Sequence, residues 1–78
     1  MGTDKNNLPK LIGKRIRIER IKREIAQEEL AEKADIHRTT MSKVERGIGY
    51  PAMDTLVKIA NALDINIEDL LSDTSIFT

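Results

Sequence analysis

The sequence predicts an all-α protein of five helices, and three observations support this. No stretch alternates apolar and polar residues for long enough to form a strand. Several stretches instead repeat apolar residues at helical spacing, and Gly, Pro and Asp residues interrupt them. With 78 residues, 40% of them apolar and 33% charged, the chain suits one small helical domain. We expect residues 8–72 to form that domain, between a disordered tail at 1–7 and a second tail at 73–78.

The first helix is predicted over residues 8–23. Pro9 is tolerated because it falls in the opening turn, where the N–H that proline lacks has no helical partner. Plotted at about 100° per residue, this helix carries two apolar stripes, and we expect the first to face the core. The stripes are Leu8, Ile12 and Ile16, and then Leu11, Ile18 and Ile21. The pattern leaves open whether the second stripe is exposed.

Two short helices are predicted at residues 27–34 and 37–46, on either side of a tight turn. Asp35 is of a residue type that enters the left-handed conformation of such a turn at modest cost. Gly47 ends the second of these helices. The residues expected to lock the two helices together are Leu30, Ala31, Ala34, Ile36, Met41 and Val44, with Ile48 continuing the helical spacing.

A loop at residues 49–51 precedes the fourth predicted helix, at 53–63, which has the clearest periodicity in the chain. Its expected core stripe consists of Met53, Leu56, Val57, Ala60 and Leu63. A short fifth helix is predicted over residues 67–71, with Asn66 as its N-cap.

The second and third predicted helices have the spacing of a helix-turn-helix unit. A helix of about eight residues, a turn of three or four and a helix of about ten give the steep crossing typical of such units. Ala31 is expected at the closest approach, because a larger side chain would push the helices apart. A plain pair of packed helices uses the same apolar spacing, so the spacing alone supports both interpretations equally.

Several segments resemble the Cro/CI-type (XRE) helix-turn-helix family. The resemblance rests on Gln27-Glu-Glu-Leu-Ala-Glu-Lys-Ala34, Asp35-Ile36 and Thr39-Thr-Met-Ser-Lys-Val-Glu-Arg-Gly47. Residues 51–63 and 67–71 are similar to the fourth and fifth helices of the family, so the match runs without a gap over residues 12–71. It implies a five-helix, lambda-repressor-like DNA-binding domain. The opening at residues 37–39 and the lack of a second domain further resemble restriction–modification controller proteins, although phage repressors and antitoxins share the scaffold.

Three positions depart from the pattern of that family. His37 stands where a small hydroxyl residue often caps the third helix, and Asp35 stands where glycine is common. Glu19 stands where the first helix usually has a leucine.

The resemblance implies that the helix at 37–46 lies in the DNA major groove, with its N-terminal residues at base edges. The predicted base-contacting residues are Arg38, Thr39 and Lys43. Arg38 can donate two hydrogen bonds to O6 and N7 of guanine, and Thr39 can offer its methyl group to thymine or its hydroxyl to any base. Lys43 lies one turn further along, where a phosphate contact is the alternative.

Gln27 begins the helix that crosses the DNA backbone, so its amide and the nearby N–H groups are expected to contact a phosphate. The other predicted phosphate contacts are Arg20, His37, Thr40, Ser42 and Tyr50. Local roles are the alternative for three of these: His37 caps its helix, Thr40 packs locally, and Tyr50 bonds within its loop. In the resembling family an arginine of the first helix pairs with the glutamate at the position of Glu45. The resemblance therefore implies a structural ion pair between Arg20 and Glu45.

A homodimer on a (pseudo)palindromic operator in double-stranded DNA is expected. One unit contacts too few base pairs to select a site, whereas two units read half-sites about 34 Å apart. The candidate interface residues are Ile65, Ile67, Leu70, Leu71 and Phe77, with Ile76 extending them. Alternatively, these residues close the core of the monomer.

Charge is unevenly distributed, although thirteen basic and thirteen acidic residues balance over the whole chain. Twelve Lys and Arg against eight Asp and Glu give residues 1–48 a net charge of +4. One Lys and five acidic residues give residues 49–78 a net charge of −4. A polarised molecule of this kind can present one basic face to DNA.

Other classes of protein fit less well. A single histidine and no cysteine leave no clustered metal ligands and no acid–base pair, so we expect neither an enzyme nor a cofactor. An antitoxin-like module that binds a partner protein is the main alternative, since the acidic half and the second apolar stripe could contact one. A basic first helix lying on a membrane would leave the other helix patterns unexplained. Without a membrane-spanning run or a secretory signal, a cytoplasmic, nucleoid-associated protein of prokaryotic, phage or plasmid origin is expected, with no small-molecule effector.

Overall fold

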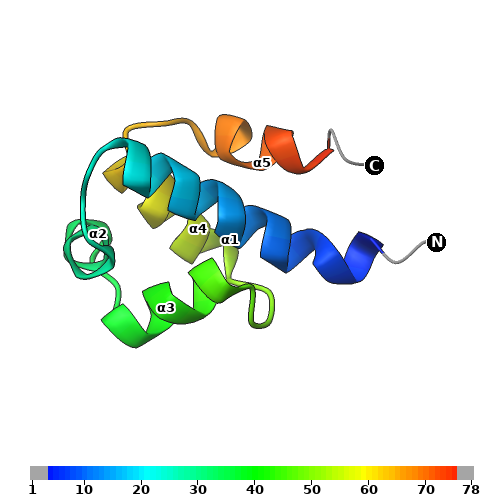
Figure 1. Cartoon of the computed structure of the whole chain (residues 1–78), viewed down its shortest axis with the longest axis horizontal. Helices are drawn as coiled ribbons and strands as arrows, with labels where there is room; N and C mark the ends of the chain where they lie inside the picture. Colours follow the sequence, from blue (N-terminus) through cyan, green and yellow to red (C-terminus); the bar gives the residue numbers. More distant parts are fainter. Residues whose placement is uncertain (1–3, 76–78) are drawn as a thin grey trace.

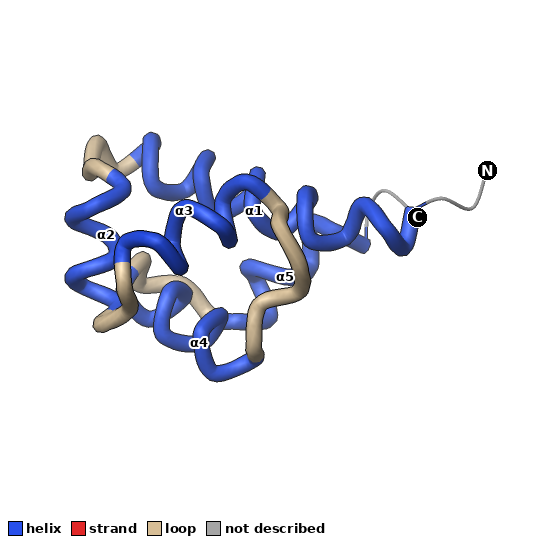
Figure 2. Tube along the Cα trace, turned by 90° about the horizontal axis from the view of Figure 1, so that it is seen from below, coloured by secondary structure: helices blue, strands red, loops and turns tan. Residues whose placement is uncertain are grey.

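The computed structural model describes residues 4–75, with the side chains of residues 7–71. This part of the chain forms five helices: α1 (Asp4–Lys22), α2 (Gln27–Ala34), α3 (Arg38–Arg46), α4 (Met53–Ala62) and α5 (Ile67–Ser75). The all-α prediction is confirmed. α1 runs along the molecule, α3 and α5 lie on opposite sides of it, and α2 crosses one end (Figure 1). Figure 2 shows the same helices from the α3 side, with α4 along one edge.

Two helices are longer than the sequence predicts. α1 begins at Asp4 and α5 continues to Ser75, so residues 4–7 and 73–75 belong to helices and not to the predicted tails. Both extensions are polar, and apolar periodicity therefore could not reveal them. Pro9 consequently lies inside α1, where it removes one intrahelical hydrogen bond.

The turns on either side of α3 have the predicted backbone conformations. Asp35 is left-handed, with φ 59° and ψ 45°, and its N–H closes the last turn of α2. Gly47 ends α3 with φ 73° and ψ 30°. Both residues adopt the conformation that allows a helix to stop abruptly, so the chain turns from α2 into α3 and from α3 into the loop before α4.

One contiguous core joins all five helices. Its fully buried large side chains are Ile16, Leu30, Met41, Ile59, Leu63 and Leu70. The predicted lock between α2 and α3 is confirmed, because Ala31, Ala34 and Val44 are also buried and Ile36 packs against them. The first stripe of α1 faces this core, and the second leaves Ile18 and Ile21 exposed.

Three predicted core positions are wrong. Met53 and Val57 are exposed on α4, and Ile48 is exposed in the loop after α3. Ile59 takes their place, because α4 is rotated so that its buried face runs through Leu56, Ile59, Ala60 and Leu63. Ile48 follows the left-handed Gly47, so the helical spacing that suggested burial no longer applies to it.

Glycine permits the close contact between α1 and α3. A Cβ atom on Gly13 would collide with the carbonyl oxygen of Val44 and approach that of Glu45 to 2.7 Å. Both atoms are backbone and cannot move aside cheaply. Gly13 is therefore the position at which α1 lies against the C-terminal turn of α3.

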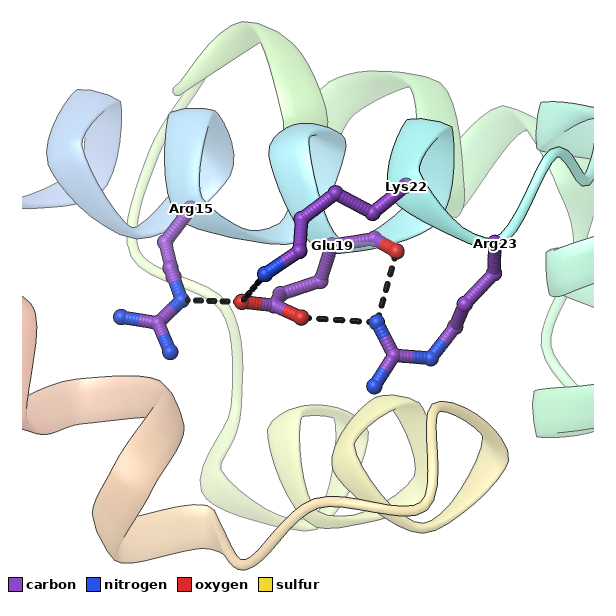
Figure 3. A network of polar contacts seen from close by, with 4 residues as sticks. All are labelled: Arg15, Glu19, Lys22 and Arg23. Carbon is purple, nitrogen blue, oxygen red and sulfur yellow. Dashed lines mark hydrogen bonds and ion pairs between the residues drawn. The ribbon is translucent and has the colours of Figure 1, made fainter.

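Glu19 is the buried charged residue of α1, with only 6% of its surface exposed. Its carboxylate accepts hydrogen bonds from Arg15 at 3.0 Å and Arg23 at 2.7 Å, and Lys22 lies at 3.6 Å (Figure 3). The Arg23 hydrogen bond, with the charges of Lys22 and Arg15, holds the pKa of this carboxyl below its usual value, although burial acts in the opposite direction. A glutamate is thus accommodated at a position on the side of α1 that faces α4 and α5.

Candidate nucleic-acid interface

α3 has one buried and one exposed face. Met41 and Val44 point into the core. At helical spacing the opposite face carries Arg38, Thr39, Ser42, Lys43 and Arg46, of which Ser42 is half-buried and the others are exposed. The helix that the sequence assigns to the major groove is therefore accessible from outside.

The N-terminal ends of α2 and α3 meet at a shallow hollow. Gln27, Glu28, Arg38, Thr39 and Ser42 line it. Arg38 contacts Glu28 at 3.3 Å, but their side chains are 71% and 75% exposed. An ion pair so exposed contributes little to the free energy of folding, and Arg38 can leave Glu28 for another partner. Four predicted contact residues therefore lie together: Gln27, Arg38, Thr39 and Ser42.

His37 caps α3. Its Nδ1 accepts a hydrogen bond from the backbone N–H of Thr39 at 3.2 Å, and its backbone is extended, as an N-cap requires. The local role of His37 is thus present in the structure. An imidazole nitrogen here replaces the hydroxyl oxygen more usual at this position.

Glu45 connects three helices. Its Oε2 accepts from Nε of Arg20 at 2.7 Å, and its Oε1 accepts from Nη2 of Arg20 at 3.1 Å and from Nε2 of Gln27 at 3.0 Å. Arg20 also donates Nη1 to the carbonyl of Ile25 at 2.9 Å. The ion pair implied by the family resemblance is present. It binds the Arg20 guanidinium inside the protein, so Arg20 is better described as a positioning residue.

Two arginines that the sequence analysis did not single out lie beside this pair. Arg17 and Arg46 line a second hollow with Arg20, Gln27 and Glu45. Because Arg20 and Glu45 compensate each other, Arg17 and Arg46 leave the hollow positively charged. For Arg17 the density of basic residues in the first helix was the available signal, but it does not tell which of them lie on the α3 side.

The remaining predicted contacts are spread around this surface. Lys43 is exposed one turn after Thr39, and Tyr50 is exposed in the loop between α3 and α4. Thr40 is half-buried on α3, between the exposed Lys43 and the buried Val44. Thr40 therefore lies at the edge of the exposed face and not at its centre.

The candidate interface residues near α5 mostly serve the monomer. Leu70 is completely buried, so it offers no surface to a partner in this conformation. Ile65, Ile67 and Leu71 are half-buried and pack against the core. Phe77 lies outside the described residues.

Residues 4–75 show neither a membrane span nor a cluster of metal-ligating side chains. None of the helices there is long and apolar enough to cross a membrane. In the same residues, no three His, Cys, Asp or Glu side chains are grouped so that they could hold a metal ion.

Comparison with known proteins assigns the family. A family model described as "Helix-turn-helix" (HTH_3) matches residues 16–70. The chain belongs to the helix-turn-helix family. The matched residues contain both hollows and the whole of α2 and α3. The protein is thus a transcriptional regulator with a helix-turn-helix DNA-binding domain of the XRE type.

Relatives of this helix-turn-helix regulator carry the names of control and repressor proteins. It is 40% identical over 72 residues to control protein C.BamHI of Bacillus amyloliquefaciens, covering 91% of this chain and 89% of that protein. It is 32% identical over 65 residues to the immunity repressor protein of Bacillus phage phi105, covering 83% of this chain and 45% of that protein. The regulator therefore matches the first relative over nearly its full length and the second over less than half.

Solved structures share the fold of the helix-turn-helix regulator. The clp gene regulator ClgR from Corynebacterium glutamicum superimposes with a TM-score of 0.82 at 24% identity, over 90% of this chain and 74% of that one. This similarity establishes the arrangement of the helices, and the roles of individual side chains rest on the geometry described above.

Proposed function

We propose that this regulator binds a (pseudo)palindromic operator as a homodimer, with α3 of each copy in the major groove. The observation that carries the proposal is that α3 has one buried face and one exposed face. Met41 and Val44 anchor the helix to the core, while Arg38, Thr39 and Lys43 project from the protein. A groove about 12 Å wide admits a helix presented in this way.

Arg38 and Thr39 read bases in this proposal. They lie in the first turn of α3, the part of a recognition helix that reaches deepest into the groove. Guanine can displace Glu28 from Arg38, since two hydrogen bonds to O6 and N7 replace one exposed ion pair. Lys43 reaches either a base edge or a phosphate from the next turn.

Phosphates bind along the two hollows that meet at Gln27. Gln27 begins α2, where Ala26 at the N-cap has no side-chain group to bond the first N–H groups, so those groups can bind a phosphate oxygen. Arg17 and Arg46 supply charge on the other side of Gln27. Ser42 and Tyr50 add hydroxyl groups, and Arg20 holds Gln27 in place through Glu45.

Regulation then follows from occupancy. A bound dimer represses where it blocks polymerase and activates where it contacts polymerase. The near full-length similarity to control protein C.BamHI supports a control protein of that kind, acting in the cytoplasm on prokaryotic, phage or plasmid DNA. Protein concentration and dimerisation set the occupancy, without a small-molecule effector.

Selection of binding sites from a random duplex library tests the proposal. We expect a palindrome whose half-sites are centred about 34–36 Å, or 10–10.5 base pairs, apart. The Arg38→Ala variant, selected in parallel, is the matched control and should lose the preference at one position of each half-site. Enrichment of a single unpaired motif would contradict the dimer, and enrichment of no sequence would contradict base reading.

A further inference from the structure

Among residues 7–71, whose side chains the structure describes, the large apolar side chains that remain exposed form two groups. Ile18 and Ile21 lie on α1, at 44% and 53% exposure. Met53 and Val57 lie on α4, at 59% and 36%, and the preceding loop adds Ile48 and Tyr50. By contrast, four of the residues that the sequence offers for an interface, Ile65, Ile67, Leu70 and Leu71, already belong to the core of the monomer or pack against it. Within the described part of the chain, apolar surface available to a partner therefore lies mainly on α1 and α4.

The exposed face of α4 carries a mixed set of side chains. Met53 and Val57 are separated by one helical turn, and so are Asp54 and Lys58, which lie beside them. All four are exposed, and the opposite face of α4 is buried through Leu56, Ile59 and Ala60. We call Met53, Asp54, Val57 and Lys58 the α4 patch.

We propose that the α4 patch is the surface through which a second copy of this chain binds. This inference rests on the proposed function, because it supplies the dimer which that function requires. In a two-fold symmetric contact the same patch faces itself. If the axis crosses α4 near the level of residue 56, the two α4 helices run antiparallel. Asp54 then lies opposite the partner's Lys58, and the same pair is repeated on the other side of the axis.

The charges of the α4 patch therefore suit self-association. Its apolar pair, Met53 and Val57, packs across the axis, and its acid and base at positions 54 and 58 complement each other in the two copies. The α1 group lacks this property. Ile18 and Ile21 are flanked by three exposed cations, Lys14, Arg17 and Lys22, and by one exposed acid, Glu24, so a two-fold contact there would bring mostly like charges together.

The position of α4 also suits binding to one duplex. Seen from the α3 side, α4 lies along an edge of the molecule (Figure 2). A two-fold axis placed at that edge, along the line of sight of Figure 2, leaves both α3 helices on the same side of the dimer. α5 lies on the side of α1 opposite to α3 (Figure 1). A two-fold contact through the outward face of α5 would turn the two α3 helices in opposite directions, which one straight duplex cannot satisfy.

Charge exchange in the α4 patch tests the inference. Sedimentation equilibrium of the full chain without DNA measures the dimer dissociation constant. Asp54→Lys and Lys58→Asp should each raise it about tenfold, because each change turns two attractive pairs into two repulsive ones. The double variant should return it to within about threefold of wild type, because both pairs are restored with their signs exchanged. Helix content from circular dichroism verifies that each variant is folded.

An apolar substitution and its control complete the experiment. Val57→Asp should raise the dissociation constant by more than about tenfold, whereas Ile21→Asp on α1 should leave it within about twofold. Wild-type protein that stays monomeric at about 100 µM would overturn the inference, because its dimer dissociation constant would then be well above that concentration. Single charge variants with the dissociation constant of wild type would also overturn it. So would a double variant whose dissociation constant is as high as those of the single variants.

The outcome for dimerisation is separate from that for the proposed function. Wild-type protein that selects a duplex motif while the α4 variants dimerise normally contradicts this interface and leaves DNA recognition standing. Protein that dimerises through the α4 patch but selects no duplex sequence supports the interface and contradicts DNA recognition.

Discussion

Glu45 accepts two hydrogen bonds from the guanidinium of Arg20, at 2.7 and 3.1 Å, across the contact between α1 and α3. The side chains of the pair are only 14% and 3% exposed. The same carboxylate accepts a hydrogen bond from Gln27 at the start of α2. The pair therefore sets the position of α3 relative to both helices that flank it.

Glu45→Ala should destabilise the fold as well as weaken DNA binding. It leaves the buried guanidinium of Arg20 without its counter-charge, which costs about 3 kcal/mol in the free energy of unfolding. For a domain of this size, that corresponds to a fall in Tm of more than about 10 °C. Thermal and urea denaturation at one protein concentration measure it. The control, Glu28→Ala, removes an exposed pair and should change the free energy by less than about 0.5 kcal/mol. A wild-type Tm for Glu45→Ala would count against the role of the pair.

Gly13→Ala should also lower stability, although alanine forms helices better than glycine. Replacing glycine in an exposed helix gains about 1 kcal/mol. Here the added methyl group meets the backbone of Val44 and Glu45, and we expect a net loss of about 2 kcal/mol. Lys14→Ala, at the exposed neighbouring position of the same helix, is the control and should cost almost nothing. Urea denaturation decides between the two effects, since a gain in stability for Gly13→Ala would show that α1 and α3 separate easily.

The Glu19 carboxylate should make stability depend on pH in the acid range. Its pKa is lowered in the folded protein, so the unfolded chain binds more protons as the pH falls. The resulting stability is fully present above the pKa of an unfolded glutamate, about 4.3, and is lost below it as the folded carboxylate protonates. Glu19→Gln should therefore be less stable than wild type at pH 7, and the difference should shrink at pH 3. Urea denaturation at both values checks this prediction. An equal difference at the two pH values would show that the charge of Glu19 is irrelevant.

Arg38→Ala should lose discrimination at one base position of each half-site. A bidentate contact to guanine contributes about 1–3 kcal/mol of preference over the wrong base. Binding to the selected operator should fall by that amount, while binding to random DNA should fall much less. Fluorescence anisotropy with both duplexes at one salt concentration measures the ratio. Equal losses on the two duplexes would contradict base reading by Arg38.

Lys43→Ala distinguishes a phosphate contact from a base contact. If Lys43 binds a phosphate, log Kd should depend less steeply on log salt concentration, with a slope smaller by about one for each copy of the residue bound. Affinity should then fall by a similar factor on operator and random duplexes. Titrations at several salt concentrations measure the slope. An unchanged slope together with lost sequence preference would instead assign Lys43 to a base.

Much of the backbone could be read from the amino-acid sequence. α2 begins and ends where the apolar spacing predicts, and α3 differs by one residue because His37 is the cap. Asp35 and Gly47 were recognisable because few residue types adopt positive φ cheaply. The polar ends of α1 and α5 were missed, since nothing in their composition distinguishes a solvated helical turn from a tail.

The type of site could be predicted from the sequence, but several of the residues that form it could not. Arg38 and Thr39 follow from their place at the start of α3, and the Arg20–Glu45 pair was implied by family resemblance. Arg17 could not be chosen among the many basic residues of α1, because the choice depends on which side of α1 faces α3. Arg46 is on α3, and only the packing of α1 against α3 brings it beside Arg17. Met53 and Val57 share the helical spacing of the core, yet the packing of α4 leaves them outside.

By itself, the sequence determined that five helices form and where the turns on either side of α3 fall. Those properties depend on apolar spacing within one turn and on the backbone preferences of single residues such as Asp35 and Gly47, and both are local. Only the tertiary structure decided how each helix is rotated about its own axis. That rotation buries Ile59 in place of Val57, and it follows from the packing of side chains from several helices into one space.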